Sequence, residues 1–259
     1  MTDPITRLDN FHTETMGYLL AVAKPGEIHV VGSERRLRKE EGYGVVFAFW
    51  MLLSYDRCVI SVRPDLKEPI EEIVNDATDA KELFTEKYRK RIDEVCRTMM
   101  PDDIAERLRP LQSYGFYIDE EHFRPFTVPG CRRLTEDDRE LIQEMTGSSK
   151  YGCPEESLAD GTAFGVVTDD KLVSLASVVP TPEATSKYHL SWPGVETLPD
   201  YRLRGYAKAV VSGVTETLLS RGITPVYSCS VTNIASANTA RSVGYQLYGE
   251  RLQWRYQPN

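Results

Sequence analysis

One short stretch, residues 201–208 (Y-R-L-R-G-Y-A-K), constrains the fold of this 259-residue chain more than any other. It follows an apolar, strand-like run at residues 189–198 and opens a helical pattern that continues to about Arg221. Gly205 permits a tight turn, and the N–H groups at a helix N-terminus attract anions. A strand, a turn and a helix start of this kind predict a pyrophosphate-binding cradle. A basic helix start with one glycine can also serve only as a cap.

The charge distribution agrees with an anion site at this turn. Arg202, Arg204 and Lys208 offer full positive charges suited to phosphate oxygens. Residues 201–259 hold seven Lys and Arg against two acidic residues, although the whole chain has a formal net charge of −8. The acidic total argues against general nucleic-acid binding, whereas the basic C-terminal stretch suits an anionic cofactor held locally. A solvated charge imbalance would look the same.

Three pieces of the second half resemble the GCN5-related N-acetyltransferase (GNAT) superfamily. Residues 202–207 (R-L-R-G-Y-A) resemble its R/Q-x-x-G-x-G/A signature, and residues 194–201 (G-V-E-T-L-P-D-Y) resemble its fourth strand and the following loop. Residues 233–236 (N-I-A-S) and 243–250 (V-G-Y-Q-L-Y-G-E) resemble its late segment. The resemblance implies an α/β (α+β) fold with a mixed, mostly antiparallel central sheet flanked by helices.

The resemblance also implies acetyl-CoA as co-substrate and a site for it. Members of the superfamily splay the fourth and fifth strands apart, and the pantetheine arm lies in the gap. Asn233 and Ser236 match positions that commonly contact the cofactor, and the alternative is that they only cap the last helix. The cofactor-binding residues that the resemblance implies are Val195, Thr197, Arg202, Arg204, Gly205, Tyr206, Ala207, Lys208, Asn233 and Ser236.

The chemistry that the resemblance implies is direct attack of a neutral amine on the thioester. Such a reaction requires a proton acceptor, and Glu196 is the one acidic side chain on the expected fourth strand before the cradle. It is therefore the candidate catalytic base, with a solvent-facing or ion-paired glutamate as the alternative. Many superfamily members place a thiolate-protonating tyrosine seven residues after the asparagine of the last helix. That position is Ala240 here, so the acid is missing or comes from elsewhere.

Patterning divides the chain into residues 1–128, an N-terminal α/β region of unassigned role, and residues 129–259, an acetyltransferase domain. The boundary is a segment at residues 122–130 with two prolines and a glycine, expected to be a packed junction. The first region is expected to pack on the second. Its expected elements are a helix at 8–23, an antiparallel sheet of strands at 28–31, 43–53 and 58–62, helices at 69–74, 80–99 and 101–111, and a strand at 115–118. The run at 43–53 is the most apolar in the chain and favours a buried strand, although its length leaves a helix possible.

The second region shows the element order that the resemblance implies. The loop at residues 146–160 is expected to help form the acceptor pocket or, as the plainer alternative, to be a surface loop. The expected elements are a strand ending near 134, a helix to Met145, a hairpin at 163–167 and 172–179, a strand at 189–198, a helix to 221, a strand at 225–230, a helix at 233–243 and a strand at 246–254.

Composition excludes several other classes of protein. The five cysteines form no C-x-x-C pair and the four histidines show no metal-ligand spacing, so neither a metal site nor a disulfide framework is expected. No run approaches 18 apolar residues, and the N-terminus lacks the form of a signal peptide, which favours a cytoplasmic protein. Nothing in the sequence indicates the oligomeric state.

The leading functional hypothesis is an N-acetyltransferase that moves an acetyl or short acyl group from acyl-CoA to a primary amine of a small molecule or peptide. The alternatives are a non-catalytic CoA-binding regulatory module and an acyltransferase that uses a longer acyl-CoA. We expect neither nucleic acid nor a membrane as a partner.

Overall fold

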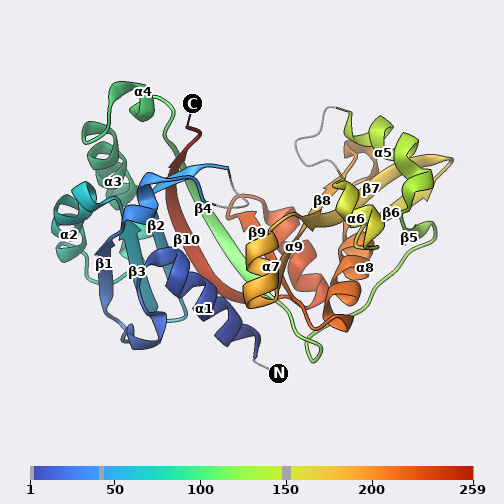
Figure 1. The fold of residues 1–259 in the computed structure, drawn as a ribbon, viewed down its shortest axis with the longest axis horizontal. Coiled ribbons are helices and arrows are strands. Elements are labelled where there is room, and N and C mark those ends of the chain that lie inside the picture. Colours follow the sequence, from blue (N-terminus) through green and yellow to red (C-terminus); the bar gives the residue numbers. More distant parts are fainter. Residues whose placement is uncertain (1–2, 41–43, 148–152, 259) are drawn as a thin grey trace. The chain divides into compact units, whose positions relative to one another are not determined.

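The computed structural model describes residues 3–40, 44–147 and 153–258 (Figure 1). The chain divides into two compact units, a first unit of residues 1–115 with 248–259 and a second unit of residues 116–247. Both units combine strands with flanking helices, which confirms the mixed α/β class. Within the part of the chain that the structure describes, no helix is long and apolar enough to cross a membrane.

The sheet of the first unit has the strand order β1-β3-β2-β10-β4. Strand β2 pairs antiparallel with both β3 and β10. The expectation of a wholly antiparallel sheet is wrong for β1, which runs parallel to β3. The physical reason is the long connection after β1, which carries the chain away before β2 and rules out a hairpin. The strands are β1 (Ile28–Gly32), β2 (Val46–Ser54), β3 (Arg57–Val62), β4 (Arg109–Tyr117) and β10 (Gln246–Tyr256).

Strand β2 is the centre of this unit and explains the most apolar run in the sequence. Phe49 and Met51 belong to one core with α2 and α3, whereas Trp50 lies edge-on to His12 of α1. A strand buried on both faces needs apolar residues at every position, so it does not alternate. The buried strand expected at 43–53 is confirmed from Val46 onward, and residue 43 lies outside the described residues.

Three helix boundaries of the first unit differ from the expected ones. Helix α1 ends at Met16, because Gly17 adopts a left-handed conformation (φ 69°) and caps it. Helix α3 begins only at Glu86, and the helix expected at 101–111 shrinks to one turn because β4 starts at Arg109. The helices are α1 (Pro4–Met16), α2 (Lys67–Asn75), α3 (Glu86–Thr98) and α4 (Asp102–Ala105).

The sheet of the second unit has the strand order β9-β8-β7-β6-β5. Strands β5 to β8 form the expected antiparallel meander, and Asp169 and Asp170, both with positive φ, make the tight turn between β6 and β7. Strand β9 runs parallel to β8. The strands are β5 (Cys131–Arg133), β6 (Phe164–Thr168), β7 (Lys171–Val179), β8 (Leu190–Thr197) and β9 (Thr224–Ser230).

Helices cover both faces of this second sheet. Leu175 of β7 packs with side chains of α5 and α6 on one face. Helix α8 lies against β6, β7 and β8 and approaches so closely that a β-carbon at Gly213 would lie 2.4 Å from the ring of Phe164. The helices are α5 (Arg139–Thr146), α6 (Glu155–Ala159), α7 (Pro182–Tyr188), α8 (Tyr206–Ser220) and α9 (Ile234–Val243).

Backbone N–H groups of the segment at residues 122–130 donate hydrogen bonds to α8 and α9 of the second unit. The Arg124 N–H donates to the Val243 carbonyl oxygen at 2.8 Å, and the Phe126 N–H donates to Ser212 Oγ at 2.9 Å. From Tyr248 onward, β10 belongs to the first unit, where it pairs with β2. Whether residues 1–128 and 129–259 act as separate domains stays a prediction.

Candidate functional site

Strands β8 and β9 pair only where they begin. Leu190 pairs with Thr224 and Ser191 with Pro225, after which β8 continues to Thr197 and β9 to Ser230 without further pairing between them. Pro193 and Pro225 have no N–H to donate, which disfavours a longer ladder between β8 and β9. Residues 192–197 of β8 therefore offer a strand edge to which an extended ligand with amide groups could add as a further strand.

The loop after β8 leads from this edge into a helix N-terminus. Leu203 (φ 62°) and Gly205 (φ 82°) have positive φ, and Arg202 (φ −69°) precedes them. Backbone of alternating φ sign turns successive N–H groups toward one side, which makes a concavity suited to anions. Helix α8 starts at Tyr206, and no side chain caps it. An uncapped helix start of this kind can bind a phosphate, and the predicted contact of Ala207 and its neighbours with one stays a prediction.

Gly205 is required at this turn by its backbone conformation and by a neighbour. Its φ of 82° lies in the left-handed region, which most residues avoid. A β-carbon there would also lie 3.3 Å from the ring of Phe126. That ring in turn lies under Lys208, whose Nζ is 4.2 Å from the ring centroid. The contact between Phe126 and Lys208 holds the ammonium group near the helix start.

Two arginines of the cradle are positioned by backbone carbonyl groups. Arg202 Nε donates to the Thr197 carbonyl oxygen at 3.3 Å, and Arg204 Nη2 donates to the Asp200 carbonyl oxygen at 3.1 Å. The guanidinium of Arg204 also lies 5.2 Å from the centroid of the Tyr201 ring. Among the described residues, neither arginine nor Lys208 forms an ion pair with a carboxylate. Their three charges are available to an anionic ligand.

Asn233 and Ser236 lie at the start of α9, where both have structural partners. Asn233 Oδ1 accepts a hydrogen bond from the Ser236 N–H at 3.1 Å, which is an N-cap. Ser236 Oγ lies 2.9 Å from the hydroxyl oxygen of Tyr227, a residue whose pKa burial raises to about 12. Capping thus accounts for these two residues, and their predicted contact with a cofactor stays a prediction.

The three candidate residues of β8 alternate across the sheet. Glu196 lies opposite Leu175 in the ladder with β7, so its side chain is on the face that α5 and α6 cover. Val195 and Thr197 lie on the other face, and Thr197 Oγ1 is 2.8 Å from Ser174 Oγ. The carboxylate of Glu196 is therefore separated from the side of the strand that carries Thr197, although both residues belong to the part of β8 that does not pair with β9.

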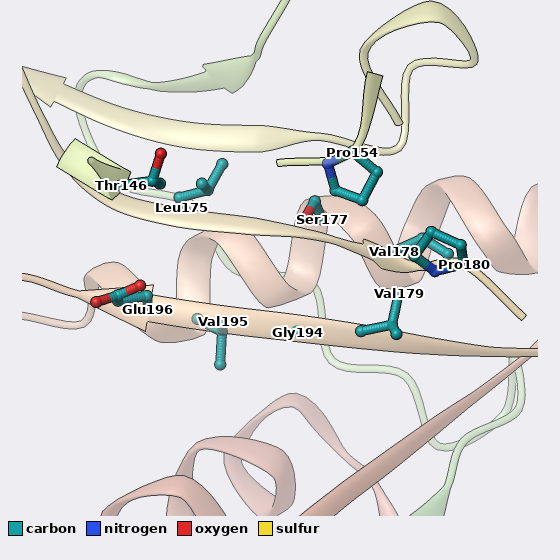
Figure 2. A pocket seen from close by; sticks show the side chains of 10 residues that line it. All are labelled: Thr146, Pro154, Leu175, Ser177, Val178, Val179, Pro180, Gly194, Val195 and Glu196. Carbon is teal, nitrogen blue, oxygen red and sulfur yellow. The ribbon is translucent and has the colours of Figure 1, made fainter. Parts of the chain in front are cut away.

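A cavity of about 210 Å³ adjoins Glu196 (Figure 2). It lies over β7 and β8, with Thr146 from the end of α5 and Pro154 from the start of α6. This agrees with the expectation that the loop at 146–160 helps to form a pocket, although residues 148–152 lie outside the described residues. The described lining residues are Thr146, Pro154, Leu175, Ser177, Val178, Val179, Pro180, Gly194, Val195 and Glu196.

Sequence reasoning missed most of this lining. Ser177 and Val179 carry no motif, Gly194 only begins the stretch that resembles the fourth strand, and strand parity alone places all three beside Glu196. The alternation of Leu175, Ser177 and Val179 along β7 would have been the signal, if the partner register of β8 had been known.

No tyrosine stands at the position expected for a thiolate acid. Ala240 is fully buried in α9 and has no proton to donate. Tyr245 is also buried, with its hydroxyl oxygen 2.8 Å from Thr215 Oγ1, and burial raises its pKa. Tyr248 belongs to the first unit and donates to Asp9 Oδ1. Among the described residues, no group of three or more His, Cys, Asp or Glu side chains could hold a metal ion.

Comparison with protein families gives one match, to the model described as GNAT acetyltransferase, over residues 63–251. No curated protein matches the chain. Solved structures with a similar fold include a protein from Novosphingobium aromaticivorans assigned to the GNAT family (21% identity, TM-score 0.47, 58% of this chain and 66% of that chain). Another is a GNAT-family acetyltransferase from Colwellia psychrerythraea (14% identity, TM-score 0.46, 60% of this chain and 59% of that chain). A third is a GCN5-related N-acetyltransferase from Sphaerobacter thermophilus (14% identity, TM-score 0.44, 80% of this chain and 76% of that chain). The chain therefore spans slightly less than two thirds of the first two structures it resembles.

Proposed function

The chain belongs to the GNAT acetyltransferase family, and on that premise we propose that it transfers an acetyl or short acyl group from acyl-CoA to a primary amine. Members of this family generally use acetyl-CoA as co-substrate. The acceptor in the proposal is the amine of a small molecule or peptide.

The observation that carries the proposal is that the part of β8 that does not pair with β9 leads directly to the uncapped N-terminus of α8. Pairing with β9 ends at Ser191, and the strand then leads through Gly205 into an uncapped helix. An acyl-CoA has the matching parts, because its pantetheine arm carries amides and its pyrophosphate carries negative charge. The edge would hold the amides, and the cradle with Arg202, Arg204 and Lys208 would hold the phosphates.

The proposed reaction needs a positioned amine, a polarised carbonyl and a proton acceptor. The amine nitrogen attacks the thioester carbon, the carbon–sulfur bond breaks, and the bonding electron pair leaves on sulfur. Backbone N–H groups along residues 192–197 can stabilise the negative charge that develops on the carbonyl oxygen. Glu196 can take the amine proton, directly or through water, because its carboxylate adjoins the cavity where the amine would lie.

A second candidate function is CoA binding without turnover. Ala240 favours it, because a methyl group cannot protonate a departing thiolate. The ordinary pKa of a thiol, near 8.5, nevertheless allows the thiolate to leave without a dedicated acid. An acyltransferase for longer acyl-CoA is the third possibility, and a comparison of acyl chain lengths distinguishes it.

One experiment separates the first two candidates. Calorimetry measures CoA binding, and a thiol reagent measures free CoA released from acetyl-CoA in the presence of a mixed pool of primary amines. Binding with amine-dependent thiol release supports the acetyltransferase. Binding without any amine-dependent release supports the binding module, and absence of binding contradicts both.

A further inference from the structure

We infer that the acceptor is a primary amine carried on a single uncharged, apolar body about as large as a hexyl or phenethyl group. The inference concerns the cavity of about 210 Å³ beside Glu196 and rests on the proposed function. Membership of the family does not determine which amine the protein accepts.

Polarity is unevenly distributed along this cavity. Figure 2 shows Glu196 and Thr146 together at one end, and Pro154, Val178, Val179 and Pro180 toward the other. A ligand with one amine and an apolar tail can satisfy both ends at once. The amine then lies beside the carboxylate of Glu196, and the tail extends along β7 toward Val179.

The dimensions of the cavity limit the length and volume of that tail. An apolar cavity of about 150 Å³ accommodates benzene in another protein, so about 210 Å³ leaves room for a ring with a two-carbon arm or for a six-carbon chain. Leu175 and Val179 are four positions apart on one strand, which is about 13 Å at the usual rise. Both measures exclude large polycyclic or oligosaccharide amines from lying wholly inside it.

Charge excludes acceptors with a second ammonium group. Glu196 is the one ionisable side chain among the described lining residues. A diamine or polyamine that entered amine-first would bring its distal charge to Val179 and Pro180, where no described lining side chain is a carboxylate. Removing an ammonium group from water without a partner is unfavourable.

Gly194 determines the width of the cavity. It lies opposite Ser177 on the floor, and an added β-carbon would meet nothing closer than Val179 Cγ2 at 3.5 Å. That is an ordinary van der Waals contact, and Gly194 does not have a positive φ. The fold would therefore tolerate alanine, whereas the cavity would lose the volume of a methyl group.

Wild-type protein tests the inference with matched amines and acetyl-CoA. We expect kcat/KM for hexylamine to exceed that for ethylamine by a factor on the order of 10², since each buried methylene is worth about fourfold. Hexylamine should also exceed 1,6-diaminohexane, which has the same length, at least tenfold. Equal or better use of the diamine or of ethylamine overturns the inference and leaves amine acetylation intact. Acetylation of no amine at all refutes the proposed function, and the inference falls with it.

Two positions sharpen the test. Val179→Asp should raise use of 1,6-diaminohexane relative to hexylamine at least tenfold, and Val179→Asn, which has the same shape without the charge, should not. Gly194→Ala should lower kcat/KM for phenethylamine more than for ethylamine. Normal CoA binding shows that each variant folds. This placement of the tail is contradicted if Val179→Asp leaves the ratio of diaminohexane to hexylamine use unchanged and Gly194→Ala leaves the ratio of phenethylamine to ethylamine use unchanged. If Val179→Asp fails to fold, the comparison of hexylamine, ethylamine and 1,6-diaminohexane on the wild type still tests the proposed acceptor class.

Discussion

The ring of Phe126 lies against Gly205, where an added β-carbon would be 3.3 Å from the ring. This contact joins the segment before β5 to the start of α8. Gly205 also has a left-handed backbone conformation (φ 82°), so a test substitution there must be a residue that tolerates positive φ.

Substitution of Gly205 tests the cradle. Asn and Asp tolerate left-handed backbone better than other residues, and they differ from each other mainly in charge. We expect Gly205→Asp to abolish CoA binding measured by calorimetry, because its carboxylate would face the phosphates. Gly205→Asn should retain more affinity at the same thermal stability. Equal CoA affinity of a folded Gly205→Asp and the wild type would rule the cradle out.

Substitution of Glu196 tests the base. Glu196→Gln should lower kcat about 10²-fold or more while CoA affinity barely changes, since the amide keeps the shape but accepts no proton. Any fall of kcat toward low pH in the wild type should disappear in the variant. Leu175, opposite on the ladder, is too apolar to replace the base. An unaltered rate and pH profile would assign proton removal to water or another group.

Burial of His12 makes the stability of the first unit depend on pH. Burial, with a smaller effect from the charge of Arg251, lowers the pKa of His12 to about 3, against an ordinary value of 6.5. Between these values the unfolded chain binds a proton that the folded chain does not, so stability is present above pH 6.5 and is lost as the pH falls. At about 1.4 kcal/mol per unit, the free energy of unfolding should fall by roughly 2 to 3 kcal/mol by pH 4.5.

The variant His12→Phe isolates this effect. Its ring can keep the stacking on Tyr248, where the two ring centroids lie 5.4 Å apart. Denaturant unfolding at pH 7 and pH 4.5 should show a smaller loss for His12→Phe than for the wild type by roughly 2 kcal/mol or more. His122, which is half-exposed and lies 2.7 Å from Asp119, provides the comparison, and His122→Gln should not make the loss smaller. Identical losses in all three proteins would contradict the neutral, buried state of His12.

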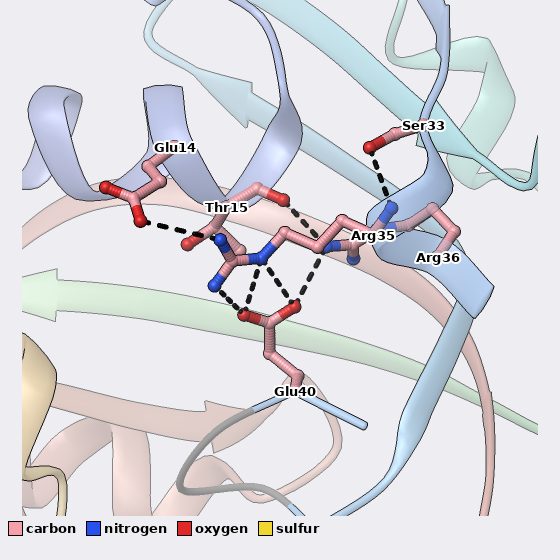
Figure 3. A network of polar contacts seen from close by, with 6 residues as sticks. All are labelled: Glu14, Thr15, Ser33, Arg35, Arg36 and Glu40. Atoms are coloured by element: carbon pink, nitrogen blue, oxygen red, sulfur yellow. Dashed lines mark hydrogen bonds and ion pairs between the residues drawn. The ribbon is translucent and has the colours of Figure 1, made fainter. Parts of the chain in front are cut away.

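A buried ion pair anchors the connection after β1 to α1 (Figure 3). Arg36 has no exposed surface, donates to the Thr15 carbonyl oxygen at 2.6 Å and pairs with Glu40 at 3.0 Å. Burial lowers its pKa to about 10, so the side chain stays charged near neutral pH and needs the carboxylate. Glu40→Gln should destabilise the protein by roughly 3 kcal/mol, the usual cost of an uncompensated buried charge.

Glu14 provides the matched control. Its carboxylate lies 3.6 Å from Arg35, and its side chain is much more exposed than that of Glu40. Glu14→Gln should change the free energy of unfolding by less than about 1 kcal/mol, as exposed ion pairs do. Chemical denaturation of both variants checks the difference, and equal effects would mean that the burial of Arg36 and Glu40 has no energetic consequence.

A fragment of residues 129–259 tests whether that region is a domain. Residues 250–256 of β10 pair with β2 in the first unit, so the fragment would expose Trp254 and a long strand edge. We expect it to aggregate, or to bind CoA without acylating the acceptor. A monomeric fragment with the activity of the whole chain, seen by size-exclusion chromatography and the thiol assay, would show that residues 1–128 are dispensable.

The local parts of the candidate site could be predicted from sequence. The turn at Gly205, the start of α8 and the N-cap at Asn233 depend on residues within about four positions of one another. A short stretch of sequence is therefore enough to predict their conformations. The hairpin of β6 and β7 belongs to the same class, since Asp169 and Asp170 suffice for its turn.

Strand pairing over long sequence separations was decided only in the tertiary structure. Arg109 looked helical but starts β4, because strand order places β4 beside β10, some 140 residues later. Likewise, Gly194 and Ser177 became cavity neighbours only through the register of β8 on β7. An extended segment forms its backbone hydrogen bonds with whichever strand lies next to it, and its own residues do not specify that partner. The sequence by itself thus determined the turn at Gly205 and the start of α8, whereas the register of the folded sheet determined the cavity.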